Sequence, residues 1–223
     1  MALLPAYRLK LYRNFKAIEG ADYYGVVRYY ERFEDDIRSL DFEEYFDCTV
    51  TYANALFETG EHGKHIVMAD HLLETVIMQN IETWGGEDIY AKLLFKKAAS
   101  LFNLEDYPRA EHILRELVKI DPWDRLRVRF LRACLLRQRP AWMPRARAVS
   151  LLFILLSAAG IAVEIFVVRP FFSDWLTAAQ RIYFGFFAVG LLMLAGSEAR
   201  HALRCFHEAE AFACTCQKRK SRP

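Results

Sequence analysis

Two long, almost uncharged apolar runs constrain this chain more than any other feature. The first, Ala148 to Val168, contains 21 residues and a single charge at Glu164, and the second extends from Ile182 to Ser197. A helix rises about 1.5 Å per residue, so the first run matches the roughly 30 Å hydrocarbon core of a bilayer. We therefore predict a two-helix transmembrane hairpin with spans at 148–168 and 182–197. The alternative is a pair of buried helices in a soluble protein.

Charge divides the chain into two parts. Residues 1–122 carry 22 acidic and 14 basic side chains, whereas residues 123–223 carry 6 acidic and 16 basic ones. Binding to nucleic acid requires basic side chains gathered on one surface, so the acidic first part argues against a nucleic-acid partner. We expect a first domain over 1–122, a basic amphipathic helix and Pro-containing linker over 123–147, the hairpin over 148–197, and a basic tail over 198–223.

Basic residues flank the hairpin on one side. Arg139, Arg145 and Arg147 precede the first span, and a second basic group follows the second span: Arg200, Arg204, Lys218, Arg219, Lys220 and Arg222. Only Arg169 and Arg181 lie between the spans. Because basic flanks stay on the cytoplasmic side, we predict an integral membrane protein with two spans and both termini cytoplasmic. No cleavable signal peptide is expected, since the apolar stretch at 1–4 is too short.

The soluble part has the pattern of an all-α fold. Over residues 6–138 apolar residues recur at three- and four-residue spacing, and Pro and Gly mark the breaks. The expected helices are roughly 6–18, 22–39, 42–59, 64–81, 87–103, 106–120 and 122–138.

The pattern A-x-x-L-F occurs twice, beginning at Ala53 and at Ala98. Each copy is followed by a turn and a second helix, opened by Ala69 and by Ala110, and about four extra residues are expected near Gly60 in the earlier copy. The later copy ends at Pro122 and resembles a tetratricopeptide repeat (TPR), over about residues 42–122. An antiparallel helical bundle without repeats is the alternative.

The resemblance implies a TPR-like helical-hairpin solenoid followed by the transmembrane hairpin. Such solenoids present a concave groove that binds peptides or helices. The resemblance places a set of residues on this groove as the binding site for a protein partner: Val50, Asn54, Phe57, Lys92, Phe95, Phe102 and Asn103.

A basic helix precedes the first span. Arg125, Arg129, Arg132 and Arg139 fall on one face, and Leu126, Phe130, Ala133 and Leu136 on another. The arginines and Trp142 are therefore candidates for contact with the membrane surface, where each Arg contributes about 1 kcal/mol with anionic headgroups. Alternatively, this helix covers the last repeat; the two interpretations are compatible.

Glu164 is the polar residue within the predicted membrane segment. An ionisable group in a span is a candidate proton relay or pore ligand. Its position near the end of the span also allows its side chain to extend to the outer interface. Ala158, Gly160, Ala162, Gly185 and Gly190 are small residues that allow close helix contacts within the hairpin or between chains.

The chain contains no motif that predicts catalysis, so we expect no enzyme and no cofactor. Two sets of residues contain side chains that can bind a metal, but neither has a specific spacing: His62, His65, His71 and Asp70; and His201, Cys205, His207, Cys214 and Cys216. The predicted topology places residues 169–181 in a short external loop, and all five Cys lie outside it, so reduced thiols are expected.

Together these features predict an adaptor or scaffold that recruits or holds a protein partner at the cytosolic face of a membrane. The alternative is an oligomerising membrane effector or channel whose soluble helical domain senses a signal or a partner. The small residues of the spans leave homo-oligomerisation open.

Overall fold

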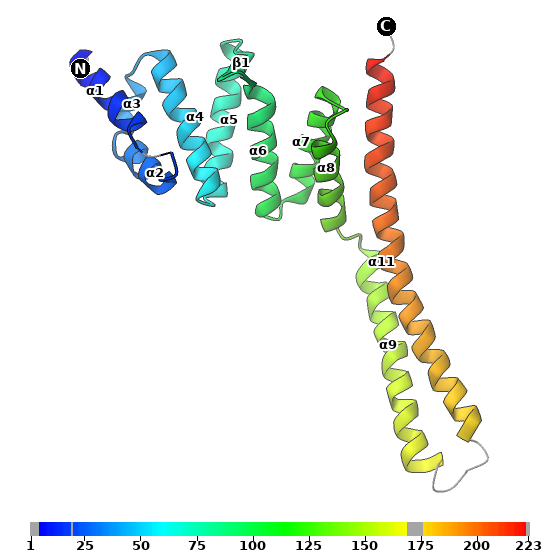
Figure 1. Cartoon of the computed structure of the whole chain (residues 1–223). Coiled ribbons are helices and arrows are strands. Elements are labelled where there is room, and N and C mark those ends of the chain that lie inside the picture. Colours follow the sequence, from blue (N-terminus) through cyan, green and yellow to red (C-terminus); the bar gives the residue numbers. More distant parts are fainter. Residues whose placement is uncertain (1–4, 19, 169–175, 222–223) are drawn as a thin grey trace. The chain divides into compact units, whose positions relative to one another are not determined.

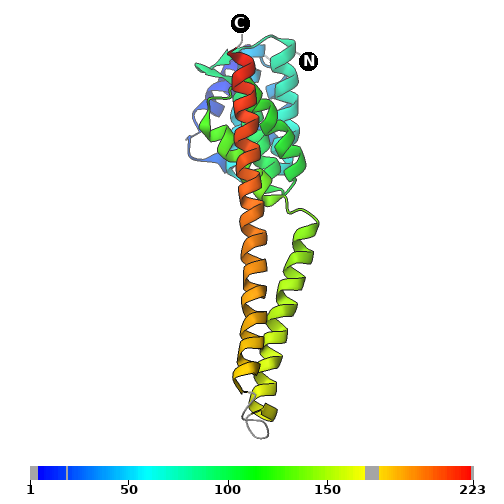
Figure 2. The ribbon, with the colours of Figure 1, turned by 90° about the vertical axis from the view of Figure 1, so that its right-hand side faces the viewer.

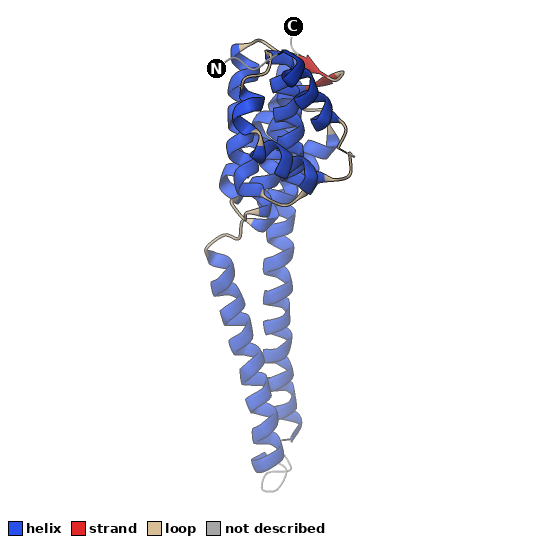
Figure 3. Ribbon diagram, turned by 90° about the vertical axis from the view of Figure 1, so that its left-hand side faces the viewer, coloured by secondary structure: helices blue, strands red, loops and turns tan. Residues whose placement is uncertain are grey.

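The computed structural model describes residues 5–18, 20–168 and 176–221, and its fold is all-α, as predicted (Figures 1 and 3). The chain forms two compact units, Met1–Cys134 and Leu135–Pro223. The unit boundary falls inside a helix that the sequence analysis assigned to the segment after the first domain. Most of that helix therefore belongs to the first unit.

The first unit is a row of helices that follow one another in chain order (Figure 1). Helix α4 packs against α5, α5 against α6, and α6 against α7. The elements are α1 (Pro5–Lys16), α2 (Tyr23–Arg32), α3 (Glu34–Arg38), α4 (Phe42–Glu58), α5 (His62–Met78), β1 (Thr83–Trp84), β2 (Glu87–Asp88), α6 (Ile89–Asn103), α7 (Tyr107–Ile120) and α8 (Arg125–Arg137).

Helices α4 and α6 each end in a turn of the same type. The N–H of Glu61 donates to the carbonyl of Leu56 at 3.0 Å, and the N–H of Asp106 donates to that of Leu101 at 2.9 Å. This is the Schellman pattern, which needs a left-handed residue just past the helix. That residue is Gly60 in one turn and Glu105, with a φ of 61°, in the other.

The two A-x-x-L-F motifs thus occupy equivalent places, because their Leu is the acceptor in each turn. Both turns contain three residues, 59–61 and 104–106, so the extra residues expected near Gly60 are not in the turn. A constant offset of 45 residues relates the two copies through this region. His65 then corresponds to Ala110, and the predicted equivalence of Ala69 with Ala110 is wrong by one helical turn.

Two local features differ from the predicted helices. The expected helix at 22–39 is divided at Phe33, where an acidic first turn, residues 34–36, starts α3. A short hairpin, β1–β2, with two residues in each strand, precedes α6. Its turn residues Gly85 and Gly86 have φ values of 62° and 81°. A hairpin turn of type I′ requires positive φ at both positions, which glycine adopts without strain. Trp84 attaches the hairpin to α4 through an edge contact with Phe46, with ring centroids 4.8 Å apart.

Two clusters of buried side chains connect the helices of the first unit. One joins α1, α2, α3 and α4 and includes Tyr30 stacked on Tyr52, with ring centroids 4.0 Å apart. The other joins α4, α5 and α6 around Phe46 and Leu72. Helix α4 contributes buried residues to both clusters and thus buries two faces.

The second unit contains α9 (Trp142–Val163), the π-helical turn η1 (Glu164–Val168) and α11 (Leu176–Lys220). Helices α9 and α11 lie side by side (Figure 2). Residues 142–166 and 177–220 form helices that are long and apolar enough to cross a membrane. α11 has 45 residues and a length of about 68 Å, more than twice a bilayer core. The predicted tail at 198–223 is therefore a continuation of the helix as far as Lys220.

Two glycines allow close contact between α9 and α11. A Cβ atom on Gly160 would lie 2.9 Å from Cβ of Tyr183, and one on Gly190 would lie 3.0 Å from the carbonyl oxygen of Ser150. Gly185 has no atom of a neighbour within 4 Å of the same position. Of these glycines, Gly160 and Gly190 therefore serve the packing of the hairpin.

We expect Gly160→Ala and Gly190→Ala to destabilise the hairpin by about 1–3 kcal/mol, the typical cost of overpacking. Thermal unfolding of the full chain in detergent measures this as a lower midpoint. Gly185→Ala is the matched control and should leave the midpoint unchanged. Equal midpoints for all three variants would contradict the contact.

Candidate functional site

A cleft lies between the start of α6 and the start of α8, within the first unit. Its volume is about 270 Å³. The α6 side contributes β2 and the first turns of the helix, and the α8 side contributes the capping residue and the first turn. The lining residues are Glu87, Asp88, Ala91, Lys92, Phe95, Asp124, Leu126 and Arg127.

Capping aspartates fix both helix starts beside the cleft. The carboxylate of Asp88 accepts the N–H of Ala91 at 2.9 Å, and that of Asp124 accepts the N–H of Leu126 at 2.8 Å. Each carboxylate satisfies an N–H that has no partner within its helix. Two backbone segments from different parts of the sequence are thereby held at the rim of one cleft.

The charges at the cleft are paired, and an apolar side chain is left exposed. Lys92 Nζ lies 2.5 Å from Glu87 Oε2, and Arg127 Nε lies 2.9 Å from Asp124 Oδ2. Leu126 is 60% exposed although it is a large apolar residue. An exposed apolar group within a polar rim is typical of surfaces that bind another protein.

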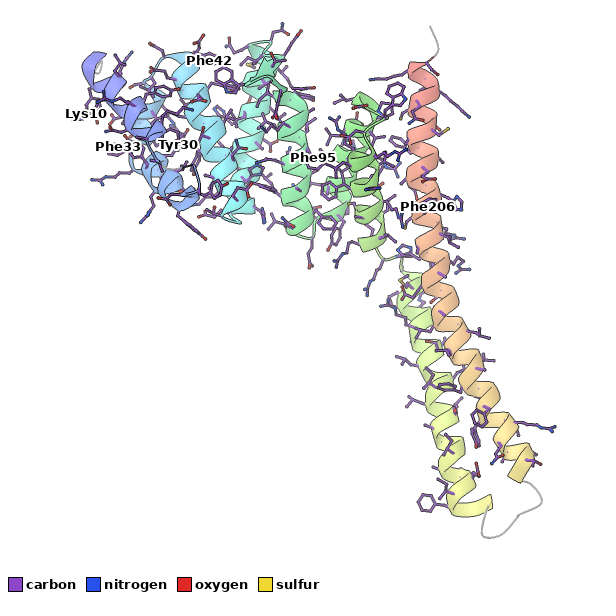
Figure 4. All side chains as sticks on the ribbon, viewed as in Figure 1. Lys10, Tyr30, Phe33, Phe42, Phe95 and Phe206 are labelled. Carbon is purple, nitrogen blue, oxygen red and sulfur yellow. The ribbon has the colours of Figure 1, made fainter. Side chains whose placement is uncertain are left out.

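Phe95 and Phe102 hold α8 against α6. Their ring centroids lie 5.5 Å and 5.4 Å from that of Phe130 on α8, and Phe95 is on the side of α6 that faces α8 (Figure 4). Phe102 also contacts Tyr107 with a centroid distance of 5.3 Å. Both predicted groove residues are therefore half-buried in helix packing, and only Phe95 also lines the cleft.

The other predicted groove residues of α4 lie elsewhere. Val50 is buried in the core shared with α5 and α6, so its side chain is not available to a partner. Asn54 lines a second cavity of about 330 Å³, which α4 forms with residues of α1 and α2. The predicted groove is thus distributed over several places, because neighbouring helices cover faces that the repeat pattern alone leaves open.

Phe57 and Asn103 belong to a third group, which surrounds two histidines of α5. The Phe57 ring lies 5.8 Å from His62 and 5.4 Å from His65, measured between centroids. Ser100 Oγ is 2.8 Å from His65 Nδ1 and 3.3 Å from His62 Nδ1. Asn103 Nδ2 is 3.1 Å from His62 Nε2. This group connects α4, α5 and α6 through polar contacts that the sequence analysis missed.

His65 is a buried neutral base in this group. Burial, with smaller contributions from the charges of Lys96 and His62, lowers the pKa of His65 from 6.5 to about 4. Its Nε2 atom is buried without a hydrogen-bond partner among the described residues. The neighbouring Ser100 hydroxyl is also buried, so no substrate reaches this Ser–His pair and its hydrogen bond is structural. The internal alignment offered a signal, since His65 stands where the other copy has Ala110.

The His, Cys and Asp residues considered as metal ligands have other contacts. His71 Nε2 lies 3.0 Å from the Tyr45 hydroxyl, and Asp70 is paired with Lys97. His201 lies 3.7 Å from Cys205 Sγ. Among the described residues no group of three His, Cys, Asp or Glu side chains is arranged to hold a metal ion.

Glu164 lies inside the hairpin of the second unit. Its side chain is 2% exposed and accepts a hydrogen bond from Gln180 Nε2 at 3.5 Å. With Tyr183 and Phe186 it also lines an apolar cavity of about 220 Å³. The carboxyl group thus faces α11, through its contact with Gln180. It begins the turn η1, and π-helical turns occur frequently at functional sites.

The arginines of α8 are exposed on one face. Arg125, Arg129 and Arg132 all lie on the solvent side. The buried face consists of Leu131, Cys134 and Leu135, whereas Leu126 and Ala133, expected on the apolar face, are exposed and half-buried. The apolar face is therefore rotated from the predicted one.

Trp142 and the arginines near it belong to the second unit. Arg139, in the linker, is exposed. The guanidinium carbon of Arg200 lies 4.4 Å from the centroid of the Trp142 ring. Arg147 Nε donates to Glu198 Oε1 at 2.8 Å. These contacts connect the start of α9 to α11, so Trp142 is half-buried at the base of the hairpin.

In comparisons with known proteins the chain matches no family model, no curated protein and no solved structure.

We expect the first unit to lose stability in acid because of His65. Below pH 6.5 the unfolded chain binds a proton at this residue that the folded chain does not bind until about pH 4. The contribution of His65 to stability is therefore constant above about pH 6.5 and falls by about 3 kcal/mol as the pH decreases to 4, at 1.36 kcal/mol per pKa unit. Urea unfolding of the full chain at several pH values measures this loss.

His65→Gln should remove this part of the pH dependence, and His112→Gln, at an exposed histidine, should preserve it. If the His65→Gln profile runs parallel to that of the unchanged chain between pH 7 and 4, the assignment to His65 is wrong.

Proposed function

We propose that this protein is a membrane-anchored, TPR-like adaptor that holds a protein partner at the cytosolic face of a membrane. The observation that carries the proposal is the cleft between α6 and α8. Two residues expected at a partner site, Lys92 and Phe95, line it together with the exposed Leu126. The partner would contribute an apolar side chain to this cleft and polar groups to its charged rim.

The repeated turns support a solenoid of helical hairpins. The turns after α4 and α6 share three-residue length and the same hydrogen bonds, and the turn after α5 has the same closing bond, from Ile81 N–H to the Val76 carbonyl at 3.0 Å. Small buried residues, Ala53 and Ala98, lie at equivalent positions of the two copies. Both features are expected of stacked helical repeats.

The exposure of apolar side chains supports a membrane anchor. Of the most apolar windows in the two long helices, only 17% and 11% of the residues are buried. Phe166 and Leu192 are 75% and 71% exposed. Two core helices of a soluble protein would bury such side chains, whereas lipid accommodates them without cost. The basic residues outside the hairpin favour cytoplasmic termini.

One observation favours the alternative of an oligomerising effector or channel. Glu164 is an ionisable residue buried in an otherwise apolar hairpin, and such residues in spans are commonly part of ion or proton pathways. Its partner Gln180 gives it a polar contact inside the unit, which a structural role also requires. The adaptor remains our first proposal because the cleft offers a binding surface outside the hairpin.

The adaptor proposal predicts a partner contact at Leu126. A photo-reactive amino acid placed at 126 should form a cross-link to the partner in native cells, because this side chain is exposed at the cleft. The same amino acid at Val67, which is 70% exposed on α5 and does not line the cleft, is the control. The cross-link at 126 should be lost when Lys92→Glu is added, since charge reversal changes the rim. Equal adducts at 126 and 67 would contradict the proposed site.

The anchor predicts resistance to alkaline carbonate, since this treatment removes proteins that are bound only to membrane surfaces. Membranes extracted in this way should retain the chain in the pellet. Protease added outside intact cells should leave residues 1–134 undigested, and the same protease should digest them after permeabilisation. Release into the supernatant, or digestion without permeabilisation, would reject the anchor or its orientation.

A further inference from the structure

We propose that Arg200 and Arg204 of α11 bind the phosphate group of an anionic phospholipid, whose acyl chain lies along the apolar part of the same helix face. The inference rests on the proposed membrane anchor, and it concerns residues of the second unit alone. It goes beyond the anchor, because contact with hydrocarbon requires no particular headgroup.

One face of α11 changes from apolar to basic at the end of the candidate span. Val189, Met193 and Gly196 follow one another at helical spacing, and Arg200 and Arg204 continue the same face. Val189 and Met193 are 44% and 39% exposed, and the other three residues are exposed as well. A Cβ atom on Gly196 would have no neighbour within 4 Å, so the face is open there. It therefore offers apolar contacts for an acyl chain beside two cationic groups for a phosphate.

Contacts within the second unit fix which side of α11 remains open. Arg147 Nε donates to Glu198 Oε1 at 2.8 Å, and His201 Nε2 lies 3.3 Å from the carbonyl oxygen of Leu136. Both contacts lie on the side of α11 that faces the start of α9 and the segment before it. The two arginines of the proposed site lie outside these contacts and remain exposed.

The hydrogen-bond donors of both guanidinium groups are available. The guanidinium carbon of Arg200 lies 4.4 Å from the centroid of the Trp142 ring. A ring contact occupies the face of a guanidinium group and leaves the N–H groups in its plane free to donate. Over the described residues neither Arg200 nor Arg204 forms an ion pair, and the nearby carboxylate of Glu198 is paired with Arg147. Trp142 thus positions one guanidinium group without using its donors, which suit phosphate oxygens.

The position of the two arginines along α11 matches a lipid headgroup. They are one turn apart, about 6 Å along the axis, so that two such long side chains can reach one phosphate. Measured from Ser197, the last residue of the predicted span, Arg200 and Arg204 are about 5 Å and about 11 Å further along the helix. The polar layer on each side of a bilayer core is roughly 5–8 Å thick. Two positive charges favour a lipid with a net negative charge, because a zwitterionic headgroup compensates its own phosphate.

Lipid binding to the full chain in detergent tests this inference. Native mass spectrometry during titration with phosphatidylglycerol or phosphatidylcholine gives the dissociation constant for each lipid. Two arginines at about 1 kcal/mol each correspond to roughly a thirtyfold change, at 1.36 kcal/mol per tenfold. Arg200→Gln combined with Arg204→Gln should therefore weaken phosphatidylglycerol binding about thirtyfold and leave phosphatidylcholine binding unchanged. Undiminished phosphatidylglycerol binding by this variant would overturn the inference.

A single substitution separates lipid binding from the packing of the hairpin. Arg200 contacts Trp142, so its loss also removes a contact inside the unit. Arg204→Gln alone leaves that contact in place and should weaken phosphatidylglycerol binding about fivefold, as expected for one arginine at about 1 kcal/mol. An effect of Arg200→Gln with none of Arg204→Gln would assign the loss to packing and would overturn the two-arginine site.

The matched control removes the same charge from the same helix. Lys218 and Arg219 are exposed on α11, more than about 30 Å beyond Ser197 and outside the roughly 10 Å range of screened charge. Lys218→Gln with Arg219→Gln should preserve the preference for phosphatidylglycerol. An equal loss in this control would overturn the inference, because the total charge of the chain would then explain the preference.

A soluble competitor separates the two sources of phosphate. Glycerol phosphate has the same phosphate chemistry without an acyl chain, and at the same concentration it should not displace the lipid. Displacement would overturn the commitment to a membrane lipid. Carbonate extraction distinguishes the two proposals: release of the chain rejects the anchor, whereas a retained chain without lipid preference rejects only the inference about Arg200 and Arg204.

Discussion

The ends of α4, α5 and α6 share one hydrogen-bond pattern, on which the helical hairpins in the middle of the first unit depend. In each turn the second residue past the capping position donates its N–H back to a carbonyl of the last helical turn. Only one left-handed residue is needed, and the chain reverses within a few residues. After α4 and α6 the next helix therefore runs antiparallel along the previous one, whereas the hairpin β1–β2 intervenes between α5 and α6. Helix contacts between neighbours in sequence, and the clefts between alternate helices, follow from that reversal.

The helices could be predicted from the sequence because the residue patterns that indicate them are local. Apolar spacing, capping aspartates and turn residues act within a few positions, and the helices around Ala53 and Ala98 begin and end within about two residues of the predicted bounds. The division at Phe33 and the short strands around Gly85 were missed. Both features are short and depend on packing, such as the contact of Trp84 with Phe46.

The candidate site was less predictable, because exposure depends on which face a neighbouring helix covers. Lys92 and Phe95 were expected at a groove and do line a cleft, but Val50 is part of the core and Phe102 packs against Phe130. The face of α8 was rotated relative to the prediction for the same reason. No local pattern in the sequence states how far α8 turns when Cys134 packs beside Tyr107.

Each unit also buries an ionisable side chain, and the two differ in consequence. Burial lowers the pKa of His65 to about 4, so it stays neutral at physiological pH, whereas Glu164 is buried beside an apolar cavity and has a polar contact with Gln180. Buried polar groups of this kind restrict the neighbouring helices to a register that satisfies them. The Ser100 and Gln180 contacts thus help to define which of several similar helix packings each unit adopts.

The length of α11 has a mechanical consequence. Beyond Ser197 the helix continues for 23 residues to Lys220 without a break, a rod of about 35 Å attached rigidly to the apolar segment. A tilt of 10° in that segment would displace the far end by about 6 Å, from the length of the rod alone. Changes in the packing at Gly160 and Gly190 would in this way be converted into sideways movement of the far end of α11.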